Sequence, residues 1–237
     1  MLTSTAVPAA SELLCARCGY VLSGLPGDSR CPECGTLISE SDPGLRGLPE
    51  WERQPGSPLA FVRTTAAVLF QPTHFFRTFA TRADRRASQW FAAIQWLAAS
   101  ILFAFAAEEH LYWTQISVGA WRPAVLPAVA VAAFVALAAT NWVASWLTYW
   151  EATYRGLRLP RSAVHRAMDY HAAHYLPVAA IAAITVGTFT TLHNSGKLPD
   201  RYELAYFYVL SGEVIVAAAY LFMTYWIAMR NIMYANA

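Results

Sequence analysis

Residues 123–147 read PAVLPAVAVAAFVALAATNWVASWL, a stretch without a charged side chain. A helix of about 20 apolar residues crosses the hydrocarbon core of a bilayer, so this stretch is long enough to span a membrane. The whole chain agrees, because 57% of its 237 residues are hydrophobic and only 14% are charged, whereas soluble domains carry about 25% charged residues. The sequence therefore predicts an all-α helical membrane protein with four transmembrane helices, at residues 90–107, 124–147, 175–192 and 205–229.

The positive charges predict the orientation of these spans. Fourteen of the 17 Lys and Arg residues precede the first span, follow the fourth, or lie between the second and third; Arg122, Lys197 and Arg201 are the others. Cytoplasmic segments carry the excess of Lys and Arg. We therefore expect a multi-pass protein of the cell inner (cytoplasmic) membrane, with both termini in the cytoplasm and the lipid bilayer as its first partner. The formal net charge of +2 gives no reason to expect nucleic acid.

All four cysteines lie in two Cys-x-x-Cys-Gly motifs near the N-terminus. Cys15 and Cys18 form the first motif, and Cys31 and Cys34 form the second after twelve intervening residues. Two thiolates three residues apart on a tight turn bind one tetrahedral ion, and two such turns complete a closed structural Zn2+ site. The sequence thus predicts a four-cysteine zinc ribbon at 13–38. So short a segment cannot build a sufficient core, so the metal should supply its folding energy.

Three other chemistries use the same motif. Two disulfides would need an oxidising compartment, which conflicts with a cytoplasmic N-terminus. A redox Cys-x-x-Cys pair normally lies on a βαβ unit, which this chain lacks. An iron site is the third alternative. Four thiolates on Zn2+ leave a local charge of −2, and Arg17 and Arg30 are placed to offset it.

The remaining segments are expected to differ in order. Residues 1–12 are predicted to be a disordered N-terminus, and 39–57 a flexible linker because Pro and Gly recur there. Residues 58–88 are predicted to be an interfacial amphipathic segment, in which Phe and Arg alternate as suits a lipid headgroup boundary. A helix packed on the cytoplasmic ends of the spans, or a fifth membrane-embedded segment at 58–80, are the alternatives. Residues 89–237 form the four-span bundle.

Five polar positions inside the spans are candidates for hydrogen bonds or chemistry. Glu213 is the only acid within a span, and an ionisable residue in lipid is a functional candidate by default. Thr185 and Ser100 come to a similar depth and are its expected hydrogen-bond partners. Glu213 is either a proton or cation site or a protonated acid that joins neighbouring helices. Gln95 and Asn141 also share a depth, and we expect them to bond to each other.

The segment before the third span contains three histidines and an aspartate. On a helix His165 and Asp169 lie about 40° apart on one face, whereas His171 and His174 lie on roughly the opposite side. We therefore expect an amphipathic helix with a hydrogen bond from His165 to Asp169, in preference to a metal site. The sequence contains no nucleophile elbow, phosphate-binding loop or dinucleotide-binding motif. An enzyme is not expected, and an intramembrane enzyme that uses these histidines is the least favoured class.

Two stretches resemble known families. Residues 69–76, LFQPTHFF, resemble the opening of the Yip-type (Ypt-interacting protein) membrane domain, in which a proline precedes paired aromatics shortly before the first span. The ribbon, CARCGYVLSGLP followed by RCPECG, is similar to the N-terminal module of a group of mostly uncharacterised bacterial membrane proteins. The first resemblance implies a role in membrane organisation, and the second implies no particular activity.

We therefore expect a non-enzymatic membrane adaptor or organiser whose zinc ribbon binds a cytoplasmic protein. The alternative is a small transporter or permeation protein with Glu213 as its coupling group. Alanine-rich spans let helix backbones approach closely, which suits a tight four-helix bundle, or a homo-oligomer if one face is left over.

Overall fold

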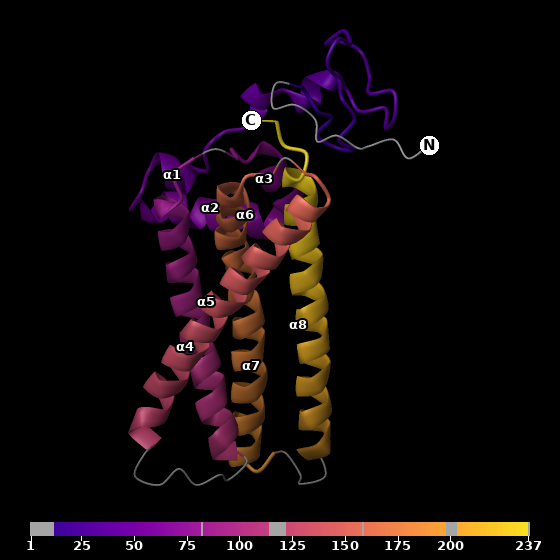
Figure 1. The fold of residues 1–237 in the computed structure, drawn as a ribbon. Helices are drawn as coiled ribbons and strands as arrows, with labels where there is room; N and C mark the ends of the chain where they lie inside the picture. Colours follow the sequence, from indigo (N-terminus) through magenta and orange to yellow (C-terminus); the bar gives the residue numbers. More distant parts are fainter. Residues whose placement is uncertain (1–11, 82, 114–121, 158, 198–202, 237) are drawn as a thin grey trace. The chain divides into compact units, whose positions relative to one another are not determined.

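A computed structural model of the chain describes residues 12–81, 83–113, 122–157, 159–197 and 203–236 (Figure 1). Within these ranges the chain is helical, with isolated β-bridges but no strand. The expected disordered N-terminus lies almost wholly outside the described residues. The elements follow the order η1 (Ile38–Ser41), η2 (Pro43–Leu45), α1 (Glu50–Arg53), α2 (Pro58–Phe70), α3 (Pro72–Thr78), α4 (Arg86–Trp113), α5 (Arg122–Tyr154), α6 (Arg161–His171), η4 (Ala172–His174), α7 (Tyr175–Asn194) and α8 (Glu203–Ile232).

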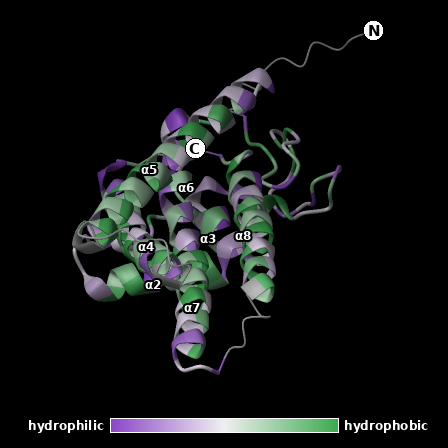
Figure 2. Cartoon of the chain, turned by 90° about the horizontal axis from the view of Figure 1, so that it is seen from below, coloured by the Kyte–Doolittle hydropathy of each residue, from purple (hydrophilic) through white to green (hydrophobic). Residues whose placement is uncertain are grey.

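Four helical segments are long and apolar enough to cross a membrane, which confirms the predicted fold class. They lie in α4, α5, α6 to α7, and α8, and Figure 2 colours the hydrophobic residues along these helices in green. The helices extend beyond the predicted spans. With 28 residues, α4 measures about 42 Å, whereas the hydrocarbon core is about 30 Å thick. Helical hydrogen bonding therefore continues past the apolar stretch, and hydropathy alone underestimates the helix length.

The chain divides into two compact units. Unit 1 comprises Met1–Phe91, Asn141–His171 and Thr224–Ala237, and it contains the ribbon, α1, α2, α3 and α6. Unit 2 comprises Ala92–Thr140 and Ala172–Met223, and it contains most of the residues of the long apolar helices.

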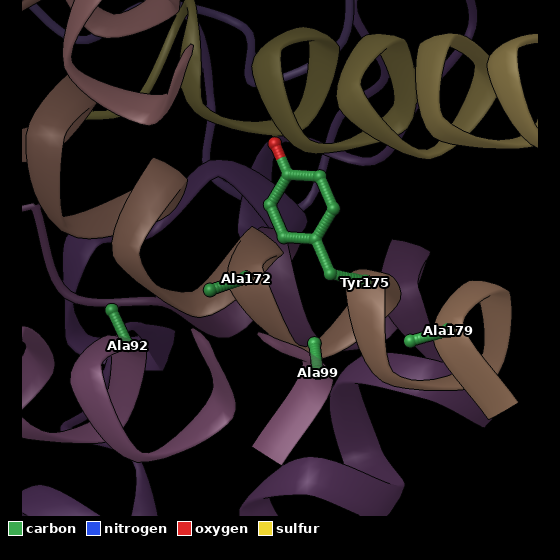
Figure 3. Packing of buried hydrophobic residues seen from close by; sticks show 5 residues of the cluster. All are labelled: Ala92, Ala99, Ala172, Tyr175 and Ala179. Atoms are coloured by element: carbon green, nitrogen blue, oxygen red, sulfur yellow. The ribbon is translucent and has the colours of Figure 1, made fainter. Parts of the chain in front are cut away.

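Unit 2 is built on close contact between α4 and α7. Buried Ala92 and Ala99 of α4 pack with Ala172 and Ala179 in one cluster, and Figure 3 shows their methyl groups together with the ring of Tyr175. Ala92 and Ala99 of α4 are seven positions apart, as are Ala172 of η4 and Ala179 of α7. Residues that repeat every seven positions keep two helices facing each other along a shared seam, and small side chains let the backbones approach. The alanine content predicts close packing, and the seven-residue spacing identifies the faces that meet.

Unit 1 has a core of aromatic rings around buried charges. The Tyr170 ring lies 5.0 Å from Phe91, 5.3 Å from Phe75 and 5.8 Å from Phe79, measured between centroids. Arg166 of the same helix, α6, is fully buried, and its guanidinium lies 4.6 Å from the centre of the Phe79 ring. Arg166 Nη2 donates to both carboxylate oxygens of Glu52, at 2.6 and 2.7 Å. The Tyr170 hydroxyl donates to the same carboxylate at 2.8 Å.

The segment expected to be a flexible linker, 39–57, is folded, and that expectation is wrong. It contains η2, α1 and part of η1, and both Trp51 and the Glu52 side chain are buried. The Trp51 indole donates to the carbonyl of Ala87 at 2.7 Å. Arg46 donates to the carbonyls of Phe79 and Asn231, and burial lowers the Arg46 pKa to about 10, so the guanidinium remains charged at neutral pH. The Pro and Gly content of this segment predicts irregular structure, but hydrogen bonds from polar side chains hold the segment in one conformation.

The segment expected to lie on the membrane surface, 58–88, has two different parts. The phenylalanines of α3 and its C-cap, Phe75, Phe76 and Phe79, are buried in unit 1, which favours the packed-helix alternative for α3. In contrast, α2 has 13 residues and leaves Leu59, Val62 and Phe70 exposed. At about 20 Å, α2 is too short to cross a bilayer.

The buried pair of Glu52 and Arg166 gives a test of the unit 1 core. Replacing Glu52 with Ala leaves a buried guanidinium without its counter-ion, so we expect a loss of about 3–5 kcal/mol in unfolding free energy. The matched control is Glu151→Ala, which breaks an Arg155–Glu151 pair whose side chains are 60% and 55% exposed; such a pair contributes less than about 1 kcal/mol. Denaturant unfolding of the detergent-purified variants measures both. Equal losses in the two variants would contradict this assignment of the core.

Candidate functional site

The four cysteines lie on two copies of one backbone motif. In the first copy the Cys15 amide donates to the carbonyl of Tyr20 at 2.8 Å, and the Gly19 amide donates to the carbonyl of Cys15 at 2.9 Å. The second copy begins sixteen residues later at Cys31 and repeats both bonds at the same distances. The repeat also places Leu22 and Ile38 in the buried core of the ribbon. Our sequence analysis identified both Cys-x-x-Cys-Gly motifs but missed the pair of aliphatic residues that follows each of them, Val21–Leu22 and Leu37–Ile38.

The sulfur atoms form a cluster that can hold one metal ion. All four Sγ atoms lie within 4.8 Å of one another. Cys15 Sγ lies 3.5 Å from Cys34 Sγ, and Cys18 Sγ lies 3.6 Å from Cys31 Sγ. A tetrahedral ion with bonds of about 2.3 Å to sulfur has ligand separations of about 3.8 Å, close to these distances. The four cysteines are free thiols, and a disulfide would need a sulfur separation of about 2.05 Å.

The thiols differ in acidity. Burial raises the pKa of Cys18 to about 12. Hydrogen bonds between Cys34 and the side chain and backbone of Thr36 lower the pKa of Cys34 to about 6. A metal binds thiolates, so it must displace protons from the more basic members of the cluster. Arg30, one of the two expected counter-charges, donates to the carbonyl of Gly35 at 2.9 Å, and Arg17 is exposed.

The C-terminal tail binds the ribbon. The side chain of Asn236 accepts from the Leu14 amide at 2.8 Å and donates to the carbonyls of Leu14 and Ser41 at 2.7 and 2.8 Å. The ring of Tyr234 lies so close to Gly19 that a Cβ atom there would be 2.6 Å from it. The ribbon is therefore integrated into unit 1, whereas the sequence analysis predicts a module tethered by a flexible linker.

Glu213 has one of its two expected partners. The hydroxyl of Thr185 on α7 donates to Glu213 Oε1 on α8, as predicted. Ser100 instead donates to the carbonyl of Leu97 in its own helix. Glu213 Oε2 is buried and has no hydrogen-bond partner among the described residues. Half of this carboxyl group is thus available for another interaction.

The predicted hydrogen bond between His165 and Asp169 is wrong. Asp169 accepts from Arg85 Nε at 2.9 Å and Nη2 at 3.0 Å, and from the Ser88 hydroxyl at 2.9 Å. His165 Nε2 accepts from Arg161 at 3.3 Å. The helical spacing does permit the predicted pair, but a bidentate guanidinium is a stronger partner for a carboxylate than a neutral imidazole.

Asn141 also has a partner that the sequence analysis missed. Its Nδ2 atom donates to Asp169 Oδ1 at 3.4 Å. The expected partner, Gln95, is buried in unit 2. The Gln95–Asn141 bond therefore stays a prediction.

His171 and His174 belong to different units, and each has its own hydrogen-bond partner. His171 Nε2 lies 3.0 Å from the hydroxyl of Thr224 in unit 1. His174 Nδ1 lies 2.7 Å from the hydroxyl of Tyr220 in unit 2. A search of the described residues for three or more metal-ligating side chains close together finds the four cysteines. The two histidines are not in such a group, so the described geometry assigns no metal to them.

Comparisons of the chain with protein families, with curated proteins and with solved structures found no match. Function must therefore be argued from the metal-binding cluster, from the helices that can cross a membrane and from Glu213.

Metal analysis tests the cysteine cluster directly. We expect about one metal ion per chain in the purified protein and almost none in the double variant Cys15→Ser, Cys18→Ser, because two thiolates cannot complete a closed site. The matched control is Asp28→Asn, an exposed change in the turn between the motifs, which should keep the metal. Elemental mass spectrometry gives the content. A metal-free parent protein would contradict the site.

Two glycines give a matched test of the tail contact. Gly19 and Gly35 have φ values of +78° and +73°, but only Gly19 lies against Tyr234, whereas Gly35 faces open space. Alanine at either position is strained by about 1–2 kcal/mol, so Gly35→Ala should lower metal affinity about tenfold, since the metal supplies the folding energy. Gly19→Ala should lower the affinity further, because the Tyr234 ring must move.

The affinities are measured by competition with a chromogenic chelator. In a Tyr234→Ala background the cost of Gly19→Ala should fall to that of Gly35→Ala. If both glycine variants lose the same affinity while Tyr234 is present, the tail does not press on the ribbon.

Proposed function

We propose that the protein is a non-enzymatic membrane adaptor or organiser whose ribbon binds a cytoplasmic protein partner. The observation that carries this proposal is the closed four-cysteine cluster, which leaves no open coordination position for a substrate. The ribbon also leaves Tyr20 and Leu25 exposed, at 40% and 39%. Tyrosine is enriched among the anchor residues of protein interfaces, and Leu25 adds an exposed apolar side chain to the ribbon surface.

We propose Zn2+ as the metal. Four thiolates with near-tetrahedral separations are typical of structural zinc, and the cytoplasm keeps thiols reduced. Iron bound by four cysteines is the alternative, and elemental analysis distinguishes the two metals. The Arg30 side chain beside the second motif offsets part of the negative charge of a zinc–thiolate centre.

The proposed location is the cytoplasmic membrane, with both termini in the cytoplasm. Four crossings return the chain to its starting side, and the hydrogen bonds between Leu14 and Asn236 join the two ends of the chain within unit 1. The excess of Lys and Arg in the terminal segments and the central loop indicates the cytoplasmic side. The resemblance of residues 69–76 to Yip-type domains supports a role in membrane organisation.

A second candidate function is a small transporter or permeation protein that uses Glu213 as its coupling group. The half-satisfied carboxyl of Glu213 favours it. Replacing Glu213 with Gln separates the two functions, because an adaptor should tolerate the change and a proton-coupled carrier should not.

Site-specific photo-crosslinking in cells tests the adaptor. A photoreactive phenylalanine analogue at the exposed Leu25 should yield one discrete adduct with a cytoplasmic protein, because an interface anchor lies against its partner. The same analogue at the exposed Trp150 of α5 is the matched control and should not give this adduct. The adduct should disappear when Cys15 and Cys18 are replaced by Ser. Absence of a protein adduct at Leu25, or an adduct that survives loss of the metal, would contradict a ribbon-based adaptor.

A further inference from the structure

A cavity of about 590 Å3 lies in unit 2 between α7 and α8. Ligand pockets for small molecules have volumes of about 300–1,000 Å3, so the cavity is large enough for one. Its walls are aliphatic except for Phe103, Tyr220 and Glu213. Ile181 and Val214, which also line it, are 53% and 69% exposed, so the mouth of the cavity opens to the outside of the helices.

Among the described residues that line this cavity, Glu213 is the one with a charged side chain. It lies ten residues into α8, about 15 Å from the start of the helix, and is therefore well inside the apolar span. Its Oε1 atom accepts from Thr185, but its buried Oε2 atom has no partner among the described residues. In an apolar environment an unpaired carboxylate oxygen costs free energy, which a cation or a donor can recover.

The chemistry of the wall selects the class of ligand. An anion would meet a carboxylate, and the described part of the wall contains no basic residue to offset it. A hard cation such as Mg2+ or Ca2+ needs six or more oxygen ligands, and the cavity offers Glu213 and a Tyr220 hydroxyl that already lies 2.7 Å from His174. An organic cation needs one counter-ion, and the rings of Phe103 and Tyr220 can add cation–π attraction. Because the mouth opens toward lipid, the ligand must also be soluble in the membrane.

We propose that this cavity binds a lipophilic organic cation, with the Glu213 carboxylate as its counter-ion and the aliphatic walls of α7 and α8 around its apolar groups. This binding function is independent of the proposed ribbon partner. An acyl chain of a membrane lipid is the competing occupant, and it would need no charge at Glu213.

Equilibrium binding of tetraphenylphosphonium to the full chain in lipid nanodiscs tests the proposal, with empty nanodiscs subtracted. We expect saturable binding of about one cation per chain. Glu213→Gln should weaken binding at least tenfold, because the amide keeps the bond to Thr185 but lacks the charge. Glu109→Gln, which removes an acid of α4 outside the cavity, is the matched control and should leave the affinity unchanged. Tetraphenylborate has the same shape and the opposite charge, and it should not bind.

A second variant keeps the proposal testable if Glu213→Gln does not fold. Ala217→Phe fills the cavity while keeping the Glu213 carboxyl group, and it should also abolish binding, while the metal content reports that the ribbon is intact. Equal binding to the parent protein and Glu213→Gln, or equal binding of tetraphenylborate, would show an apolar groove for lipid chains and overturn the proposal. Absence of saturable binding to the parent protein would overturn it as well. Each of these results leaves the crosslinking test of the ribbon unaffected.

Discussion

The fully buried guanidinium of Arg166 determines how the N-terminal part of unit 1 folds. Removing an ion from water costs several kcal/mol unless partners compensate it. The partners of Arg166 are the Glu52 carboxylate and the carbonyl of Ala80, and they come from segments that flank α2 and α3. Both segments must therefore lie against α6. This requirement explains why residues rich in Pro and Gly are ordered, and why Trp51 and the phenylalanines of α3 are buried.

The sequence predicts the features of the structure that depend on a local pattern of residues. A run of apolar residues predicts a membrane-length helix because every backbone hydrogen bond of a helix is local, and Cys-x-x-Cys-Gly predicts a metal knuckle because both thiols lie on one turn. Pairings across the chain cannot be predicted in this way: Glu52 and Arg166 are 114 residues apart, and Arg85 and Asp169 are 84 apart. Where a local partner and a distant one compete, as at Asp169, spacing alone favours the local residue and is misleading.

The ribbon shows how a small metal module becomes part of a larger unit. Its own buried core consists of two cysteines, Leu22 and Ile38, which is too little to fold so short a segment without a metal. The Asn236 side chain adds what the ribbon lacks, because one amide group satisfies the Leu14 amide and two carbonyls at once. The tail and the segment after the ribbon therefore stabilise a four-cysteine cluster that is able to hold a metal ion.

Three carboxylates illustrate the difference between a structural acid and an available one. Asp169 accepts four hydrogen bonds, and Glu52 accepts three. Glu213 accepts one, from Thr185, and leaves a buried oxygen without a partner among the described residues. A carboxyl group that only joins two helices would gain stability by using both oxygens, since lipid offers no water to replace the missing bond. One oxygen of Glu213 is therefore not used in joining the described helices, and this oxygen is the basis of the cation-binding proposal.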